Sequence, residues 1–174
     1  MPIAPINLRD GQRAERKTLI TVAEWTEGEG ASATQVREIL GVRTEDSSIN
    51  YNAEITTTTD ILGNNYSDMD KTQPEQTFDA RPVIGGSKLT ALLNDIRRRN
   101  ALSELQQFTI YVITSFVGSA GAYEAEKHDD CSITYDSIGG DVTVNFPITV
   151  HFSNKITTGT VDKMADDFVF TADV

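Results

Sequence analysis

The residue types that could do chemistry gather in one short segment, His128-Asp129-Asp130-Cys131. Successive side chains of a strand point to opposite faces, so we expect His128 and Asp130 to share one side and Cys131 to face away from them. This alternation excludes a local nucleophile pair between Cys131 and His128. A cation bound by His128 and Asp130 would lack a third ligand nearby, so a solvated polar face is the better interpretation.

Motifs typical of enzymes and of cofactor or metal sites do not occur in the sequence. The glycine-rich loop Glu27–Thr34 matches neither a P-loop nor a dinucleotide fingerprint, and its glutamates argue against phosphate binding. No GxSxG, HExxH, EF-hand or Walker pattern is found. Cys131 is the single cysteine, so it forms no intrachain disulfide, and we expect a small buried strand residue. The sequence therefore predicts a protein that is not an enzyme, with no cofactor and no metal site.

Composition and charge limit the partners of the chain. Its 174 residues suit one domain and carry a formal charge of −11, from 26 acidic and 15 basic residues. Such a protein lacks the basic surface of a DNA reader, and for most proteins an acidic balance means only solubility.

The longest apolar stretch, Ile110–Val117, is far shorter than the roughly 20 residues of a spanning helix, so we expect no membrane segment. The N-terminus lacks the features of a secretory signal, which favours synthesis and assembly in cytoplasm.

The clearest periodic signal runs from Ser47 to Ile61. Apolar and β-branched residues alternate with polar ones, which predicts one long strand with an apolar face and a polar face. A turn follows at Leu62–Asn65, and a weaker alternation over Asp68–Asp79 predicts a return strand. Pro74 cannot donate to a ladder, so we expect an edge or bulge there, where this hairpin arm leaves the body of the sheet.

A second clean alternation covers Val142–Ser153, after a turn at Ser137–Gly140. Further strands are predicted at Lys17–Trp25, at Phe108–Val117 and at Tyr123–Tyr135, with a turn at Gly118 and Gly121. The Phe108–Val117 strand is apolar on both faces and should be central. One or two short strands should follow in the tail, with Phe168 and Phe170 as apolar anchors. Residues 1–16 are expected to form an arm, and residues 17–174 one domain.

One helix is predicted after the cap Ser87. Leu89, Leu92, Leu93 and Ile96 fall on a single stripe, which should lie against a sheet. The triplet Arg97–Arg99 suits the helix end or acidic neighbours better than a nucleic-acid patch. Pattern alone thus predicts an antiparallel sheet packed on a core, with one helix, and it does not choose the function.

Several segments resemble the major tail proteins, or tail tube proteins, of long-tailed bacteriophages and prophages. The likeness covers most of residues 41–161, and its most telling pieces are EDSSI (Glu45–Ile49), TTTTDILG (Thr56–Gly63), IGGSKL (Ile84–Leu89) and SIGG (Ser137–Gly140). The resemblance implies a mainly β fold, an antiparallel β-sandwich or half-barrel flanked by one α-helix. Six copies would form a hexameric ring, whose inner sheets join into a continuous β-barrel.

The resemblance also implies a structural role in the virion tail. Rings would stack into a tube around a tape-measure protein, next to tail terminator and distal tail proteins, and the tube would conduct DNA into the host cell without sequence-specific binding. In relatives, a long hairpin and the terminal arms reach the adjacent ring. Here that role would fall to residues 1–16 and to the hairpin loop 61–72, with Ile61, Leu62, Asn64, Asn65, Tyr66 and Met69 as contact residues.

The polar strand faces then become candidates for the lining of the channel. These residues are Asn50, Asn52, Glu54, Thr56 and Thr58 from one strand, and Asn145, Thr149 and His151 from another. An acidic or neutral lining lets DNA slide, because rings of lysines would retain it at every layer.

Three alternatives stay open at this stage. The inner tube of a contractile tail or injection system would share the fold, and a sheath around the tube would identify it. A monomeric β-sandwich that binds carbohydrate or protein would stay monomeric at every concentration. An enzyme would need a site that the sequence does not contain.

Overall fold

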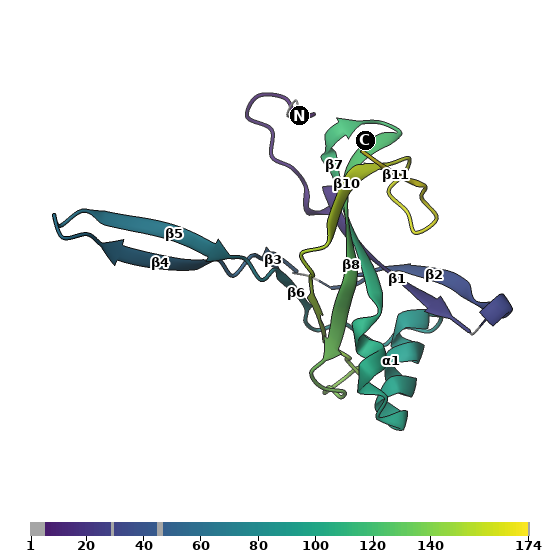
Figure 1. Cartoon of the computed structure of the whole chain (residues 1–174). Coiled ribbons are helices and arrows are strands. Elements are labelled where there is room, and N and C mark those ends of the chain that lie inside the picture. Colours follow the sequence, from purple (N-terminus) through teal and green to yellow (C-terminus); the bar gives the residue numbers. More distant parts are fainter. Residues whose placement is uncertain (1–5, 29, 45–46, 174) are drawn as a thin grey trace.

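The computed structural model describes residues 6–28, 30–44 and 47–173. Over these residues the chain is mainly β with a single α-helix, as predicted (Figure 1). The strands are β1 (Leu19–Glu27), β2 (Thr34–Ile39), β3 (Ile49–Asn50), β4 (Glu54–Thr59), β5 (Asn65–Lys71), β6 (Glu75–Phe78), β7 (Phe108–Ser119), β8 (Ala122–Tyr135), β9 (Ile148–His151), β10 (Ile156–Val161) and β11 (Phe170–Ala172). The helices are α1 (Lys88–Arg99) and the short 3-10 helices η1 (Arg16–Thr18), η2 (Gly30–Ser32) and η3 (Leu102–Gln106).

Strand β8 lies at the centre of the sheet and connects its two halves. Its first half pairs with β7 on one side and β10 on the other, and its second half pairs with β9. The order β2-β1-β7-β8-β9-β6-β3 is antiparallel throughout the described pairings, with β11 beside β10. A β-bulge separates the halves. Phe108 of β7 pairs with Cys131 of β8, but Ile110 pairs with His128, so β8 contains one extra residue between the two pairs. Asp130 takes a left-handed φ of 56° at this bulge. Within the described residues the sheet stays open, with edge strands β2, β3 and β11.

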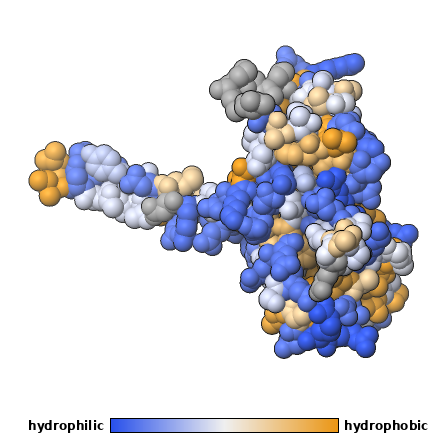
Figure 2. Space-filling model, turned by 45° about the vertical axis from the view of Figure 1, so that its right-hand side comes forward, coloured by the Kyte–Doolittle hydropathy of each residue, from blue (hydrophilic) through white to orange (hydrophobic). Residues whose placement is uncertain are grey.

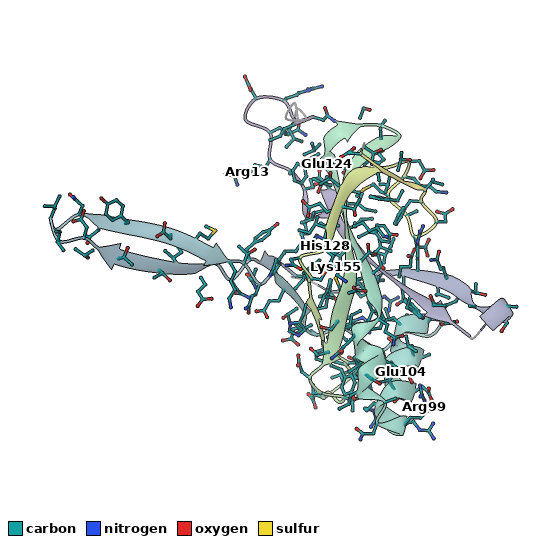
Figure 3. All side chains as sticks on the ribbon, viewed as in Figure 1. Arg13, Arg99, Glu104, Glu124, His128 and Lys155 are labelled. Carbon is teal, nitrogen blue, oxygen red and sulfur yellow. The ribbon has the colours of Figure 1, made fainter. Side chains whose placement is uncertain are left out.

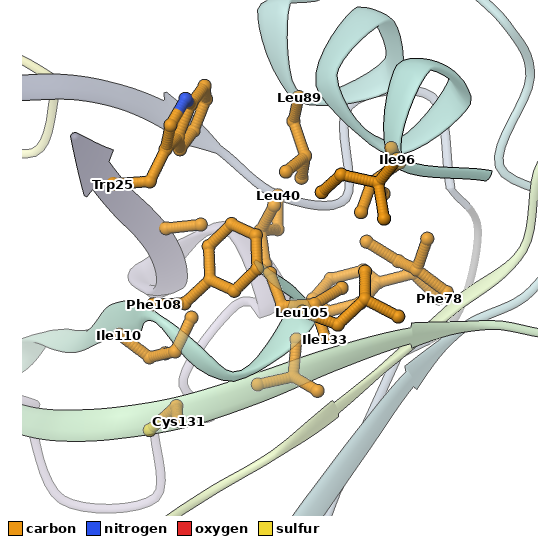
Figure 4. Close-up of a cluster of buried hydrophobic side chains, with 14 of the residues drawn as sticks. Trp25, Leu40, Phe78, Leu89, Ile96, Leu105, Phe108, Ile110, Cys131 and Ile133 are labelled. Atoms are coloured by element: carbon orange, nitrogen blue, oxygen red, sulfur yellow. The ribbon is translucent and has the colours of Figure 1, made fainter. Parts of the chain in front are cut away.

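The main core lies where α1 packs against both halves of the sheet (Figure 4). Leu89, Leu93 and Ile96 of the helix are fully buried, as the apolar stripe predicts. They join Trp25 of β1 and residues of β6, β8 and β9 in one cluster. A second cluster forms under β10 and the C-terminal segment, from Val22, Tyr111, Ile113, Ala125, Val161 and Phe168. Two clusters on one continuous sheet explain how a chain of this length stays in one domain.

Helix α1 begins and ends as its sequence predicts. The Ser87 hydroxyl accepts a hydrogen bond from Thr90 N at 3.1 Å, and Asn100 ends the helix in the left-handed region. A carboxylate from β2 adds a second cap, because Glu38 Oε2 accepts from Leu89 N at 3.0 Å. Arg99 pairs with Asp95 at 2.7 Å and with Glu104 at 2.8 Å, so acidic neighbours hold this arginine.

The prediction of one long strand over Ser47–Ile61 is wrong, because the segment is divided into β3 and β4, and its apolar residues Tyr51, Ile55 and Ile61 are exposed. Pairing between β3 and β6 ends at Asn50, and β4 pairs with β5 in a two-stranded sheet of its own. Between them Asn52 has a φ of 45°, and its Nδ2 donates to Gln73 O. The β4–β5 hairpin therefore projects from the body (Figure 1). The predicted role of Pro74 is confirmed, because it lies between β5 and β6 where the hairpin leaves the sheet.

The second long alternation is realised only in part. Phe146, Ile148 and Val150 are fully buried as expected, but the strand β9 covers only Ile148–His151. Val142 is 92% exposed and precedes the strand in an irregular loop. Pro147 explains the late start, because it has no N–H to donate to a neighbouring strand.

The remaining strand predictions hold, with two differences. β7 is an interior strand between β1 and β8, as its apolar faces predict, and β10 and β11 form the tail strands beside Phe168. Strand β2 is not predicted from the sequence, because its polar residues show no clear alternation. Gly118 lies inside β7 at an irregularity in the pairing, not in the turn. No helix among the described residues is long and apolar enough to cross a membrane.

Candidate functional site

The His128-Asp129-Asp130-Cys131 segment does not form the solvated face that its alternation suggests. The bulge at Asp130 breaks the alternation, so His128 is 4% exposed while the Asp130 carboxylate is in solvent and pairs with Lys155. Figure 3 labels His128 and Lys155. The His128 ring packs edge-on against Phe152 with 4.9 Å between ring centroids. Its Nε2 lies 3.4 Å from Glu126 Oε2, and this contact lowers the pKa of the Glu126 carboxyl. His128 is therefore a core histidine with a carboxylate partner.

Cys131 is a buried strand residue, as predicted. Burial raises the pKa of its thiol, and Ser153 N donates to the sulfur at 3.4 Å. A thiol in this environment is a poor nucleophile. In the part of the chain that the structure describes, no group of three or more histidine, cysteine or acidic residues could hold a metal ion.

Polar residues from four strands do meet on one outer face of the sheet. Asn50 of β3 lies opposite Glu75 of β6, which lies opposite His151 of β9, which lies opposite Ser132 of β8. The next row on the same face contains Thr77, Thr149 and Thr134. We call this set the polar sheet face.

Hydrogen bonds tie the polar sheet face together across the strands. The hydroxyls of Thr77 and Thr149 lie 3.1 Å apart, and the Thr134 hydroxyl lies 3.1 Å from His151 Nε2. The intervening row, which includes Gln76, points to the opposite side and is buried. Thr149, in the middle of the face, is only 9% exposed, whereas Asn50 and Thr77 at its edge are exposed.

The structure brings together three of the eight residues predicted to line a channel. Asn50, Thr149 and His151 lie on the polar sheet face. The others lie elsewhere: Asn52 at the base of the hairpin, Glu54, Thr56 and Thr58 on β4, and Asn145 in the loop before β9. Four further members of the polar sheet face, Glu75, Thr77, Ser132 and Thr134, are not among the residues predicted from the sequence. Glu75 and Thr77 alternate in the return strand, and this signal could have found them.

The β4–β5 hairpin is the second candidate site. Its strands extend about 20 Å at the usual rise per residue, and its free end carries a hydrophobic cluster (Figure 2). The cluster consists of Ile61 and Leu62, both fully or largely exposed. The other four predicted contact residues, Asn64, Asn65, Tyr66 and Met69, also lie at the tip or on β5.

The tip of the hairpin is held in one shape by Asp60. Its Oδ1 accepts from Leu62 N at 2.8 Å and from Asn64 N at 2.9 Å. Its Oδ2 accepts from the Asn64 side chain at 3.0 Å and from the Tyr66 hydroxyl at 3.1 Å. These bonds, the Asn64 side chain first, lower the pKa of the Asp60 carboxyl. Such a turn presents Ile61 and Leu62 outward at little conformational cost.

Fold and sites together define a mainly β protein with an open antiparallel sheet and a protruding apolar-tipped hairpin. No family model matches the sequence, and no curated protein matches it. Among solved structures, a chain of the anti-feeding prophage (AFP) baseplate is similar, with a TM-score of 0.49, 10% identity and coverage of 85% of this chain and 96% of that chain. A chain of the PVC sheath-tube complex, an extracellular contractile injection system, has a TM-score of 0.45, 13% identity and coverage of 87% and 94%. Both TM-scores lie below 0.5, so neither likeness indicates a function for this chain.

Proposed function

We propose that this chain is the structural subunit of a phage-type tail tube, which assembles as stacked hexameric rings and conducts DNA. The observation that carries the proposal is the hairpin. Within the described residues its two strands pair only with each other, and the hairpin presents Ile55 and Met69 on its strands and Ile61 and Leu62 in its turn to solvent. An isolated two-stranded hairpin is marginally stable in water, so a neighbouring molecule is needed to cover it.

The open sheet supports lateral association in the same proposal. β2, β3 and β11 are edge strands in the described part of the chain, and each leaves one strand edge without a partner there. Such edges favour pairing with another chain, and closure of a ring removes them. The resemblance to tail tube sequences supports six copies to a ring.

The polar sheet face suits the lining of the channel. Its residues are threonine, serine, asparagine, histidine and one glutamate, with no lysine or arginine among them. A surface of this kind gives DNA no counterion-releasing contacts. In the assembled tail the tube would surround a tape-measure protein and would meet terminator and distal tail proteins at its ends.

Assembly of the purified protein tests this proposal. We expect rings or hollow tubes on concentration, seen by negative-stain microscopy and by sedimentation. A variant with residues 55–69 replaced by a Gly-Gly turn should keep the fold of the body and lose stacking. Compact single particles of the wild-type protein at every concentration would favour a monomeric binding module and contradict the proposal.

A further inference from the structure

The two faces of the β4–β5 hairpin differ in charge. Residues directly opposite in an antiparallel pair point to the same side. The pairs Ile55–Met69, Thr57–Ser67 and Thr59–Asn65 therefore share one side, which we call the uncharged face. The pairs Glu54–Lys71, Thr56–Asp68 and Thr58–Tyr66 share the other, which we call the charged face.

The uncharged face is apolar at its base and small at its centre. Ile55 and Met69 lie directly opposite each other, and they are 60% and 65% exposed. Beyond them, the hydroxyls of Thr57 and Ser67 lie 3.4 Å apart, and the Thr59 hydroxyl donates to Asn65 Oδ1 at 2.6 Å. These polar groups satisfy one another across the strands, so burial of this face would leave few unpaired groups.

The charged face is suited to water. Lys71 and Glu54 form an exposed ion pair at 3.3 Å, and Asp68 is exposed on the same side. Burial of these groups would cost desolvation energy that the attraction between Lys71 and Glu54 does not offset.

We propose that the uncharged face, together with Ile61 and Leu62 at the tip, packs against a second copy of this chain while the charged face stays in solvent. This assignment rests on the proposed function, which makes the neighbour a copy of the chain. Charge favours this orientation, because every copy carries −11 and the charged face would bring Asp68 toward a surface of like sign. The uncharged face meets that surface without repulsion.

Matched carboxylates on neighbouring residues test the orientation. Thr57→Asp places a charge on the uncharged face, and Thr58→Asp places the same charge on the charged face of the same strand. Both residues are exposed in the subunit, so both variants should fold alike. We expect the concentration needed for polymerisation to rise at least about tenfold for Thr57→Asp, because the carboxylate must be desolvated against an acidic neighbour, and to change less than about twofold for Thr58→Asp.

Cysteine accessibility gives a second, independent measurement. Ser67→Cys lies on the uncharged face and Asp68→Cys on the charged face, while native Cys131 is buried and gives little background. With maleimide, we expect Ser67→Cys to react at least about tenfold more slowly in polymers than in subunits, and Asp68→Cys to react equally in both.

The outcomes separate the two proposals. A wild-type protein that never polymerises overturns the proposed function and the orientation with it. Polymers in which Thr57→Asp and Thr58→Asp behave alike, or in which Ser67→Cys stays as reactive as in the subunit, overturn only the orientation. Protection of Asp68→Cys in place of Ser67→Cys shows that the charged face is the buried one.

Discussion

The guanidinium of Arg37 lies over the ring of Phe168, with 4.4 Å from its carbon to the ring centroid. Arg37 Nη1 also donates to Phe168 O at 2.7 Å, and its Nε pairs with the Glu24 carboxylate. Tyr111 packs edge-on against Phe168, and its ring centroid lies 5.3 Å from the Arg37 guanidinium carbon. Burial raises the pKa of Tyr111 to about 12. One side chain of β2 thus fastens the C-terminal segment to the sheet.

Removal of this contact should loosen the C-terminal segment. We expect Arg37→Ala to lower the free energy of unfolding by about 2 kcal/mol, because it leaves Glu24 without its cation and removes the ring contact. Arg37→Lys should recover part of the loss, since lysine keeps the charge but not the planar fork. Urea unfolding checks both. A loss below about 0.5 kcal/mol for Arg37→Ala, the range of ordinary surface substitutions, would show that the segment is held by other contacts.

The carboxylate of Glu38 should stabilise α1 from outside the helix. It accepts from Leu89 N and from the Ser87 hydroxyl, and it lies 3.4 Å from buried Arg81. We expect Glu38→Ala to cost about 3 kcal/mol, because it leaves a buried guanidinium without its counter-charge. Ser87→Ala removes only the local cap and should cost about 1 kcal/mol. Thermal unfolding followed by circular dichroism compares the two, and equal losses would contradict a separate role for Glu38.

Acid should destabilise the protein in part through Glu126. Its contact with His128 holds the pKa of the Glu126 carboxyl below its ordinary value. The ionised form is therefore favoured in the folded state, and its contribution is present above the unfolded pKa and lost as the pH falls through the folded pKa. Glu126→Gln should flatten the acid limb of the stability profile and leave stability at pH 7 lower than wild type. An unchanged acid limb would show that other carboxylates govern it.

Residues of the polar sheet face should tolerate a larger side chain, but a positive charge there should impair DNA delivery. Thr77 is exposed on this face, so neither Thr77→Lys nor Thr77→Glu should prevent assembly. Lysine repeated in every ring should lower DNA delivery by at least about tenfold through phosphate contacts, whereas glutamate should leave it near wild type. Infectivity or DNA-release assays on assembled particles measure this. Equal delivery by both variants would move the lining to another face.

Elements whose signals are local were predicted well. The Ser87 cap and the apolar stripe of α1 lie within one helix, and the apolar run that begins at Phe108 marks an interior strand wherever its partners lie. Pro74 marks the base of the hairpin because proline lacks an N–H in any context. These features depend on neighbours in the chain.

Two-faced alternation misled the prediction in the two places where it was clearest. The residues after Asn50 leave the sheet because their partner is β5 and not β6, and Val142 lies before the strand because of Pro147. The pattern describes what a strand could bury, but not which strand lies beside it. The bulge at Asp130 likewise buried His128 against expectation.

The sequence by itself determined the antiparallel β class, the helix, the hairpin and the lack of catalytic motifs, because composition, caps and turn residues act over a few positions. Only the tertiary structure decided which polar residues share a face. Asn50, Thr149 and His151 are brought together by registers between strands far apart in the chain. The two sides of the hairpin were likewise distinguished by the pairing of β4 with β5. Strand register depends on long-range hydrogen bonding and burial, which no local pattern contains.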